Sequence, residues 1–207
     1  ARANLIAERV PPSRVFVTGN TVVDSLLWAR SRAERGCPDD TVLITLHRRE
    51  SFGEPLRSII LGLRDFLEAT PAARVLWPVH PNPNVARGID ELLGDTPRFT
   101  RTEPLDYPSF ISTLATCRFV LTDSGGLQEE APSFGKTVLV ARERTEREEA
   151  IEGGRNRLVG RSRESVLSGL LSAWAERPHE GPLPAPNPFG DGRAAERIAA
   201  VITEAID

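Results

Sequence analysis

The 207-residue sequence contains no methionine and only two cysteines. Cys37 and Cys117 have neither the spacing of a metal site nor that of a disulfide framework, so a reducing, cytoplasmic location is expected. Because even an initiator methionine is missing, we expect the chain to be a piece of a longer protein.

Long apolar runs and concentrated basic charge are missing as well. No run is long enough to cross a bilayer, and the N-terminus lacks a basic start followed by an apolar core, so no membrane association is expected. Acidic residues outnumber basic ones, 29 to 26, and no stretch concentrates the basic residues, which argues against nucleic-acid binding. A composition of 40% hydrophobic and 27% charged residues is ordinary for a soluble globular domain with a real core.

From residue 41 onward, short apolar runs alternate with amphipathic segments. The run from Val42 to Leu46 is apolar almost throughout, as in a strand buried on both faces, and Pro55 opens a segment with helical apolar spacing. Further strands are expected at 74–79, 99–103, 118–122, 138–141 and 158–159. Such repeated units predict an α/β fold with a doubly wound, mostly parallel sheet that binds ligands beyond the carboxyl ends of its strands.

Three segments can be distinguished along the chain. Residues 1–40 read as a connector, because they show no self-contained core. Residues 41–176 carry the alternating pattern and form the predicted Rossmann-like domain. Residues 177–207 combine a proline-rich strap with a last amphipathic helix, which must dock elsewhere after so long an extended segment.

The most informative stretch is the Asp-Ser-Gly-Gly turn at residues 123–126, where an apolar strand stops and a helix-compatible segment begins. Gly125 and Gly126 leave room for a ligand near the backbone, and the free N–H groups at the start of the next helix can bind phosphate oxygens. Glu129 and Glu130 follow within reach of a ribose or sugar hydroxyl. A plain strand-to-helix turn with an N-cap is the alternative.

Two other strand ends carry candidate ligands. His47, Arg48, Arg49 and Glu50 follow the first strand, and four such residues are costly to bury as packing. In a doubly wound sheet this loop faces the glycine turn, so His47 could contact a phosphate or act as an acid. Solvated ion pairs, such as an arginine with Glu50, are the alternative. His80, set between prolines, fits a structural role and a ligand contact equally well.

The loop after the fifth strand, residues 142–149, is densely charged. Most of this charge fits a solvated helix face. One of its arginines could reach the glycine turn, because this loop neighbours the loop after the fourth strand, but the residues alone do not indicate which one.

Seven motifs in a specific order and spacing cover nearly the whole chain. They are Val-Thr-Gly-Asn-Thr at 17–21, His-Arg-Arg-Glu at 47–50, Pro-Val-His-Pro-Asn-Pro at 78–83, Glu-Pro-Leu-Asp-Tyr at 103–107, residues 123–132, Thr-Glu-Arg at 145–147 and Asn-Pro-Phe-Gly-Asp-Gly at 187–192. Together they resemble the UDP-N-acetylglucosamine 2-epimerases of the non-hydrolysing bacterial type. The resemblance implies the Rossmann-like C-terminal domain of a two-domain GT-B isomerase, with a missing N-terminal domain and a homodimeric full-length enzyme.

The resemblance also implies roles for the residues that match the family's motifs. UDP would be bound by Ser124, Gly125 and Gly126 at the diphosphate, Glu130 at the ribose, Leu105 to Phe110 at the uracil and Arg147 near the phosphates. His47 would be the catalytic residue, close to the departing UDP. Arg48, Glu50 and His80 would line an interdomain cleft that binds a second, activating UDP-sugar. Neither a redox cofactor nor a metal is implied.

The implied reaction interconverts UDP-GlcNAc and UDP-ManNAc by eliminating UDP across C1 and C2 and adding it back. The family's carboxylates for the C2 proton lie in the N-terminal domain, so this chain alone is expected to be inactive. The alternatives are a hydrolysing 2-epimerase, another GT-B sugar-nucleotide enzyme, and a non-enzymatic UDP-sugar-binding module. Four residues depart from the family's usual ones: Ser51 for Asn, Glu148 for Pro, Arg155 for Thr and Phe189 for Tyr.

Overall fold

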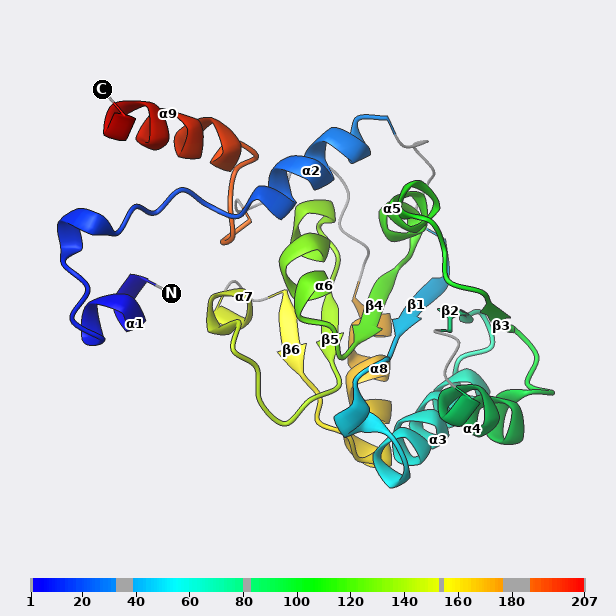
Figure 1. Cartoon of the computed structure of the whole chain (residues 1–207). Coiled ribbons are helices and arrows are strands. Elements are labelled where there is room, and N and C mark those ends of the chain that lie inside the picture. Colours follow the sequence, from blue (N-terminus) through cyan, green and yellow to red (C-terminus); the bar gives the residue numbers. More distant parts are fainter. Residues whose placement is uncertain (1, 33–38, 80–82, 153–154, 177–186, 207) are drawn as a thin grey trace.

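A computed structural model describes residues 2–32, 39–79, 83–152, 155–176 and 187–206 (Figure 1). Its strands are β1 Thr41–Thr45, β2 Arg74–Pro78, β3 Phe99–Thr102, β4 Phe119–Thr122, β5 Val138–Val140 and β6 Asn156–Leu158. They pair in parallel in the order β3-β2-β1-β4-β5-β6. The order reverses between β1 and β4, so the predicted doubly wound α/β fold is confirmed.

Helices cover both faces of this sheet. One face packs against α3 (Glu54–Ala69), α4 (Pro83–Leu93) and α8 (Arg163–Ala175), and the other packs against α5 (Tyr107–Thr116) and α6 (Gly125–Glu130). The remaining elements near the sheet are α7 (Glu148–Glu152) and the 3-10 helices η2 (Arg49–Ser51) and η3 (Ala131–Phe134).

The strand sequences explain why there are two cores. All four residues of β4 are buried. Leu121 joins the core under α3 and α8, whereas Val120 joins the core under α5 and α6, because successive side chains point to opposite faces of a strand. Continuous apolar strands therefore require helices on both sides, and the loops at the carboxyl edge remain free to carry function.

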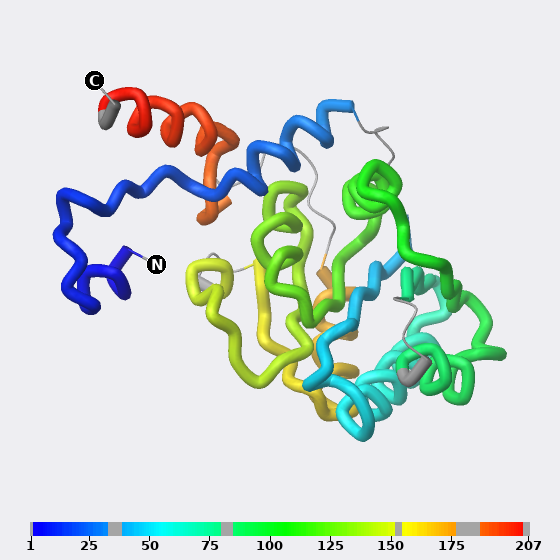
Figure 2. Tube along the Cα trace, viewed as in Figure 1, coloured from blue at the N-terminus to red at the C-terminus, as the bar shows by residue number. Residues whose placement is uncertain are grey.

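Two helices flank this domain, and a third stands away from it. α2 (Thr21–Arg30) packs against α5, α6 and α9 (Ala194–Ile206). α1 (Arg2–Ala7) and the 3-10 helix η1 (Pro12–Arg14), which precede α2 in the chain, contribute no buried residue. Figures 1 and 2 show α1 apart from the sheet. The carboxylate of Asp24 accepts hydrogen bonds from the N–H groups of Ala194 and Ala195 at 3.2 and 2.9 Å.

The division into segments 1–40, 41–176 and 177–207 stays a prediction. Within it, α2 packs on the sheet domain, and α9 contacts α2 through the hydrogen bonds from Ala194 and Ala195 to Asp24. The proline-rich stretch 177–186 lies outside the described residues. Of the helices that are described, none is both long enough and apolar enough to span a membrane.

Candidate functional site

The loops after β1 and β4 meet at the carboxyl edge of the sheet. Asp123, directly after β4, has no exposed surface. Its Oδ1 accepts a hydrogen bond from the N–H of His47 at 3.1 Å, and its Oδ2 accepts bonds from the N–H of Arg48 and the hydroxyl of Ser51, both at 3.0 Å. This carboxylate therefore holds the His47 loop against the start of the glycine turn.

Two threonines hold the turn itself. The hydroxyl of Thr122 accepts a hydrogen bond from the N–H of Ser124 at 2.9 Å and donates to the carbonyl of Thr45 at 3.1 Å. The Ser124 side chain makes no capping bond to α6. Its hydroxyl and the first N–H groups of α6, which have no partner within the helix, can therefore bind a ligand.

Arg147 lies over Gly125. A Cβ atom at residue 125 would come within 2.9 Å of Arg147 Cζ and 3.0 Å of its Nη2. Glycine at this position lets the guanidinium lie directly over the turn, because a methyl group here would displace it. Among the arginines of the 142–149 loop, the structure thus places Arg147 at the glycine turn.

Glu129 fixes this arginine. Nε of Arg147 donates to Oε1 of Glu129 at 3.0 Å, and a second N–H of Arg147 pairs with Glu146. The other oxygen of Glu129 accepts a hydrogen bond from Nδ2 of Asn20 at 2.6 Å. The sequence marked Glu129 only as a carboxylate that could reach a hydroxyl, and it assigned nothing to Asn20.

Glu130 sits beside this network without joining it. Its side chain makes no hydrogen bond or ion pair with any residue that the structure describes. Burial, and then the charge of Glu129, raises the pKa of Glu130 to about 7. Burial and then the Glu130 charge also raise the pKa of Tyr107. A carboxyl whose pKa is raised to about 7, and whose side chain has no partner among the described residues, is a candidate ligand group.

The predicted uracil segment, Leu105 to Phe110, runs from β3 into α5. Asp106 begins the helix by accepting a hydrogen bond from the N–H of Ser109 at 2.9 Å. Leu105 and Phe110 are partly buried, and Phe110 packs on the core beneath α5. Tyr107 is 44% exposed. Because the charge of Glu130 contributes to raising the pKa of Tyr107, this segment and the end of α6 lie close together.

Arg48 and Glu50, predicted for an interdomain cleft, belong to a charged cluster with the loop after β5. Arg48 lies 3.8 Å from both Glu50 and Glu146. Arg142, which is only 14% exposed, lies 3.4 Å from Glu50 and 3.0 Å from Glu146. Sequence reasoning gave Arg142 no particular role. His80 lies outside the described residues.

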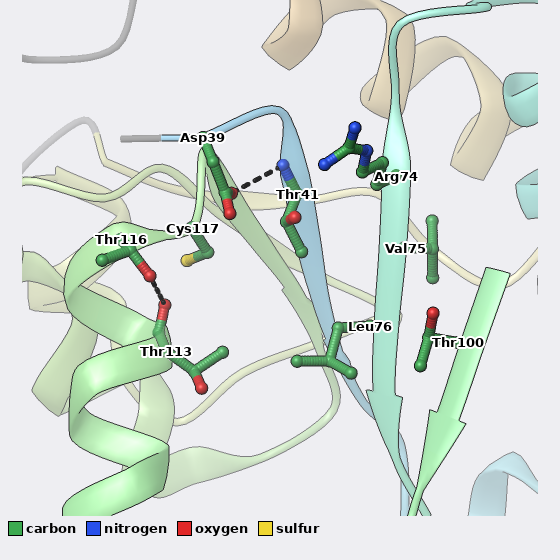
Figure 3. Close-up of a pocket in the computed structure, with 9 residues that line it drawn as sticks. All are labelled: Asp39, Thr41, Arg74, Val75, Leu76, Thr100, Thr113, Thr116 and Cys117. Atoms are coloured by element: carbon green, nitrogen blue, oxygen red, sulfur yellow. Dashed lines mark hydrogen bonds between the residues drawn. The ribbon is translucent and has the colours of Figure 1, made fainter. Parts of the chain in front are cut away.

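A separate cavity of about 250 Å³ opens near the amino ends of β1 and β2 (Figure 3). Asp39, Thr41, Arg74 and Cys117 are among its lining residues. Burial raises the pKa of the Cys117 thiol to about 12, so this thiol is unreactive. The cavity lies at the opposite edge of the sheet from the glycine turn and is lined by none of the predicted site residues. Nowhere in the described ranges do His, Cys, Asp and Glu side chains group as metal ligands.

The strand order and the loops at the β1–β4 reversal place the chain in the class of Rossmann-like domains, which bind ligands at that edge. The sequence profile of the UDP-N-acetylglucosamine 2-epimerase family matches residues 1–203. The chain therefore belongs to the UDP-N-acetylglucosamine 2-epimerase family.

Individual relatives support this assignment. The UDP-N-acetylglucosamine 2-epimerase of Salmonella typhimurium is 41% identical over 214 residues, which cover 96% of this chain and 57% of the relative. S. aureus MnaA, in a co-structure with UDP, aligns with a TM-score of 0.90 at 33% identity over 99% of this chain and 57% of that chain. The UDP-GlcNAc 2-epimerase of Neisseria meningitidis, bound to UDP-GlcNAc, aligns with a TM-score of 0.86 at 31% identity over 98% of this chain and 59% of that chain.

The fold matches the GT-B-like domain of these epimerases, as predicted. The chain spans less than two thirds of the length of each of the three relatives.

Proposed function

We propose that this chain is the UDP-holding part of a UDP-GlcNAc 2-epimerase. One observation carries the proposal. The Arg147 guanidinium lies directly over Gly125, beside the first N–H groups of α6, which have no partner within the helix. A diphosphate is well bound by this combination of backbone donors and a fixed cation. The proposal is supported by relatives of the same fold that were solved with UDP and with UDP-GlcNAc.

In this arrangement the diphosphate lies on residues 124–126 and Arg147. The ribose hydroxyls donate to Glu130, whose carboxylate has no competing partner among the described residues. The uracil lies along residues 105–110, next to Glu130 through Tyr107. The two recognition elements thus meet at the end of α6.

The reaction breaks the bond between C1 and the diphosphate as the proton leaves C2, and it then re-forms that bond after the proton returns on the other face of C2. Cations and backbone donors at the turn stabilise the negative charge on the departing UDP. The His47 side chain, half exposed next to the turn, faces the same leaving group. Groups that move the C2 proton would come from the rest of a full-length protein, so turnover by this chain alone is not expected.

The same proposal includes three further expectations. A second, activating UDP-sugar would contact Arg48, Glu50 and His80. The full-length protein would be a homodimer and would act in the cytoplasm.

Calorimetric titration of the folded chain with UDP tests the cradle. Glu130→Gln and Gly125→Ala should each weaken binding by about 1–3 kcal/mol, because the first removes a charged acceptor and the second displaces Arg147. Glu91→Gln, an exposed carboxylate on α4, is the matched control and should bind as the unchanged chain does. Equal affinity in all four chains would refute the assigned residues.

A full-length protein that contains this chain would separate the epimerase from its hydrolysing alternative. We expect interconversion of UDP-GlcNAc and UDP-ManNAc without net release of UDP. Net UDP release together with free sugar would identify a hydrolysing enzyme instead.

A further inference from the structure

Asp123 is a buried carboxylate whose charge has no arginine or lysine partner within the described part of the chain. Its hydrogen bonds come from two successive backbone N–H groups and from the Ser51 hydroxyl. Burying an acid is expensive even when it is hydrogen-bonded. A neutral side chain could hold the loop by the same kind of hydrogen bonds at a lower desolvation cost. The buried negative charge therefore needs an explanation of its own.

That role is indicated by the imidazole of His47. Nδ1 of His47 lies 3.4 Å from Oδ1 of Asp123. The carboxylate is fully buried, whereas half of the His47 side chain is exposed. The ring thus has one nitrogen beside the buried charge, while Nε2 lies on the other side of the ring, away from that charge.

We propose that Asp123 is a positioning residue that fixes the tautomer and orientation of His47. A carboxylate beside Nδ1 favours a proton on that nitrogen, because a carboxylate oxygen accepts a hydrogen bond from it. Nε2 is then the nitrogen without a proton in the neutral ring. The ligand that Nε2 meets depends on the proposed function, whereas the tautomer does not.

The tautomer can be measured without any ligand. In the chain with ¹⁵N-labelled histidine, long-range ¹H–¹⁵N spectra at about pH 9, where a histidine ring is neutral, report which nitrogen carries the proton. The other two histidines, His80 and His179, are assigned by their replacement with glutamine. We expect His47 to show an upfield, protonated Nδ1 and a far-downfield, unprotonated Nε2.

Two variants separate a positioning role from a purely structural one. Asp123→Asn keeps the shape but offers an amide N–H to Nδ1, so the proton should move to Nε2 and the two resonances should exchange positions. Ser51→Ala removes another hydrogen bond from the same carboxylate without touching the imidazole, and it should leave the His47 spectrum unchanged.

A proton on Nε2 in the unchanged chain would overturn the proposal. So would an unaltered His47 spectrum in a folded Asp123→Asn chain. If that variant does not fold, the unchanged chain and Ser51→Ala still decide the question, because movement of the proton in the latter would show that loop closure alone sets the tautomer. Added UDP should shift Nε2, and a missing shift with the Nδ1-protonated tautomer intact would contradict the proposed function and leave the positioning role standing.

Discussion

At the scale of the residue, Glu130 shows how a binding group can oppose folding. Its pKa rises from 4.5 to about 7 because burial disfavours the charged form and the neighbouring Glu129 adds repulsion. The folded chain therefore holds this proton more tightly than the unfolded chain. Such a position is tolerated where a ligand supplies the missing hydrogen-bond donors.

The pH dependence of stability follows from this shift. The Glu130 contribution favours the folded chain below about pH 4.5 and is lost as the pH rises through 7, because the unfolded chain then binds fewer protons than the folded one. Glu130→Gln should raise the free energy of unfolding at pH 8 by about 1–2 kcal/mol and should have little effect at pH 4.5. Urea unfolding at the two pH values measures the difference. A destabilised glutamine variant at pH 8 would mean that the carboxylate has a partner in the folded chain.

At the scale of the element, close packing of α3 on α8 depends on Gly62. A Cβ atom there would lie 2.7 Å from the carbonyl oxygen of Arg163 and 3.3 Å from the side chain of Val166. The first contact is with a backbone oxygen, which cannot move away by a change of side-chain rotamer. The helices would have to separate to admit even a methyl group.

Gly88 on α4 provides the matched comparison, since its nearest neighbour to an added Cβ is the Ile60 side chain at 3.8 Å. Gly62→Ala should destabilise the chain by about 1–3 kcal/mol through overpacking. Gly88→Ala should be neutral or stabilising by up to about 1 kcal/mol, because alanine favours the helix. Thermal and urea unfolding of both variants test the pair, and equal effects would show that α3 and α8 can adjust.

At the scale of the whole molecule, Glu129 joins the site to both flanks of the chain. Its carboxylate binds Asn20, and its carbonyl oxygen accepts a hydrogen bond from Nδ2 of Asn187 at 2.7 Å. The N–H of Asn20 in turn donates to the carbonyl of Phe189 at 2.7 Å. The segments before α2 and before α9 thus meet at the helix that carries the proposed ribose ligand.

Two substitutions at Asn20 separate its tasks. Asn20 also caps α2 by accepting a hydrogen bond from the N–H of Val22 at 3.0 Å. Asn20→Ser keeps a capping oxygen and loses the bond to Glu129, whereas Asn20→Ala loses both. We expect the alanine variant to be less stable than the serine variant by about 1 kcal/mol in urea unfolding, and both to bind UDP more weakly because Glu129 holds Arg147. Unchanged UDP affinity in both would show that Arg147 does not need this support.

Much of the fold was predictable from local patterns. The apolar run at 42–46 and the helical spacing of apolar residues after it are local patterns, so the sequence shows them directly. The parallel arrangement of the strands then brings the carboxyl ends of β1 and β4 together. For that reason the sequence alone predicts that the turn at residues 123–126 and the His47 loop lie at one edge of the sheet. The motif resemblance added the family, which the comparisons show.

The contacts that organise the site were decided by the tertiary structure alone. Asp123 meets the N–H of His47 from 76 positions away, and Glu129 meets Asn20 from 109. The close approach of the Arg147 guanidinium to Gly125 likewise brings together two loops. A periodic pattern records only which side of a strand or helix a residue occupies. The pairing of charges between loops depends on how the whole sheet is closed, so it emerges only when the chain is folded.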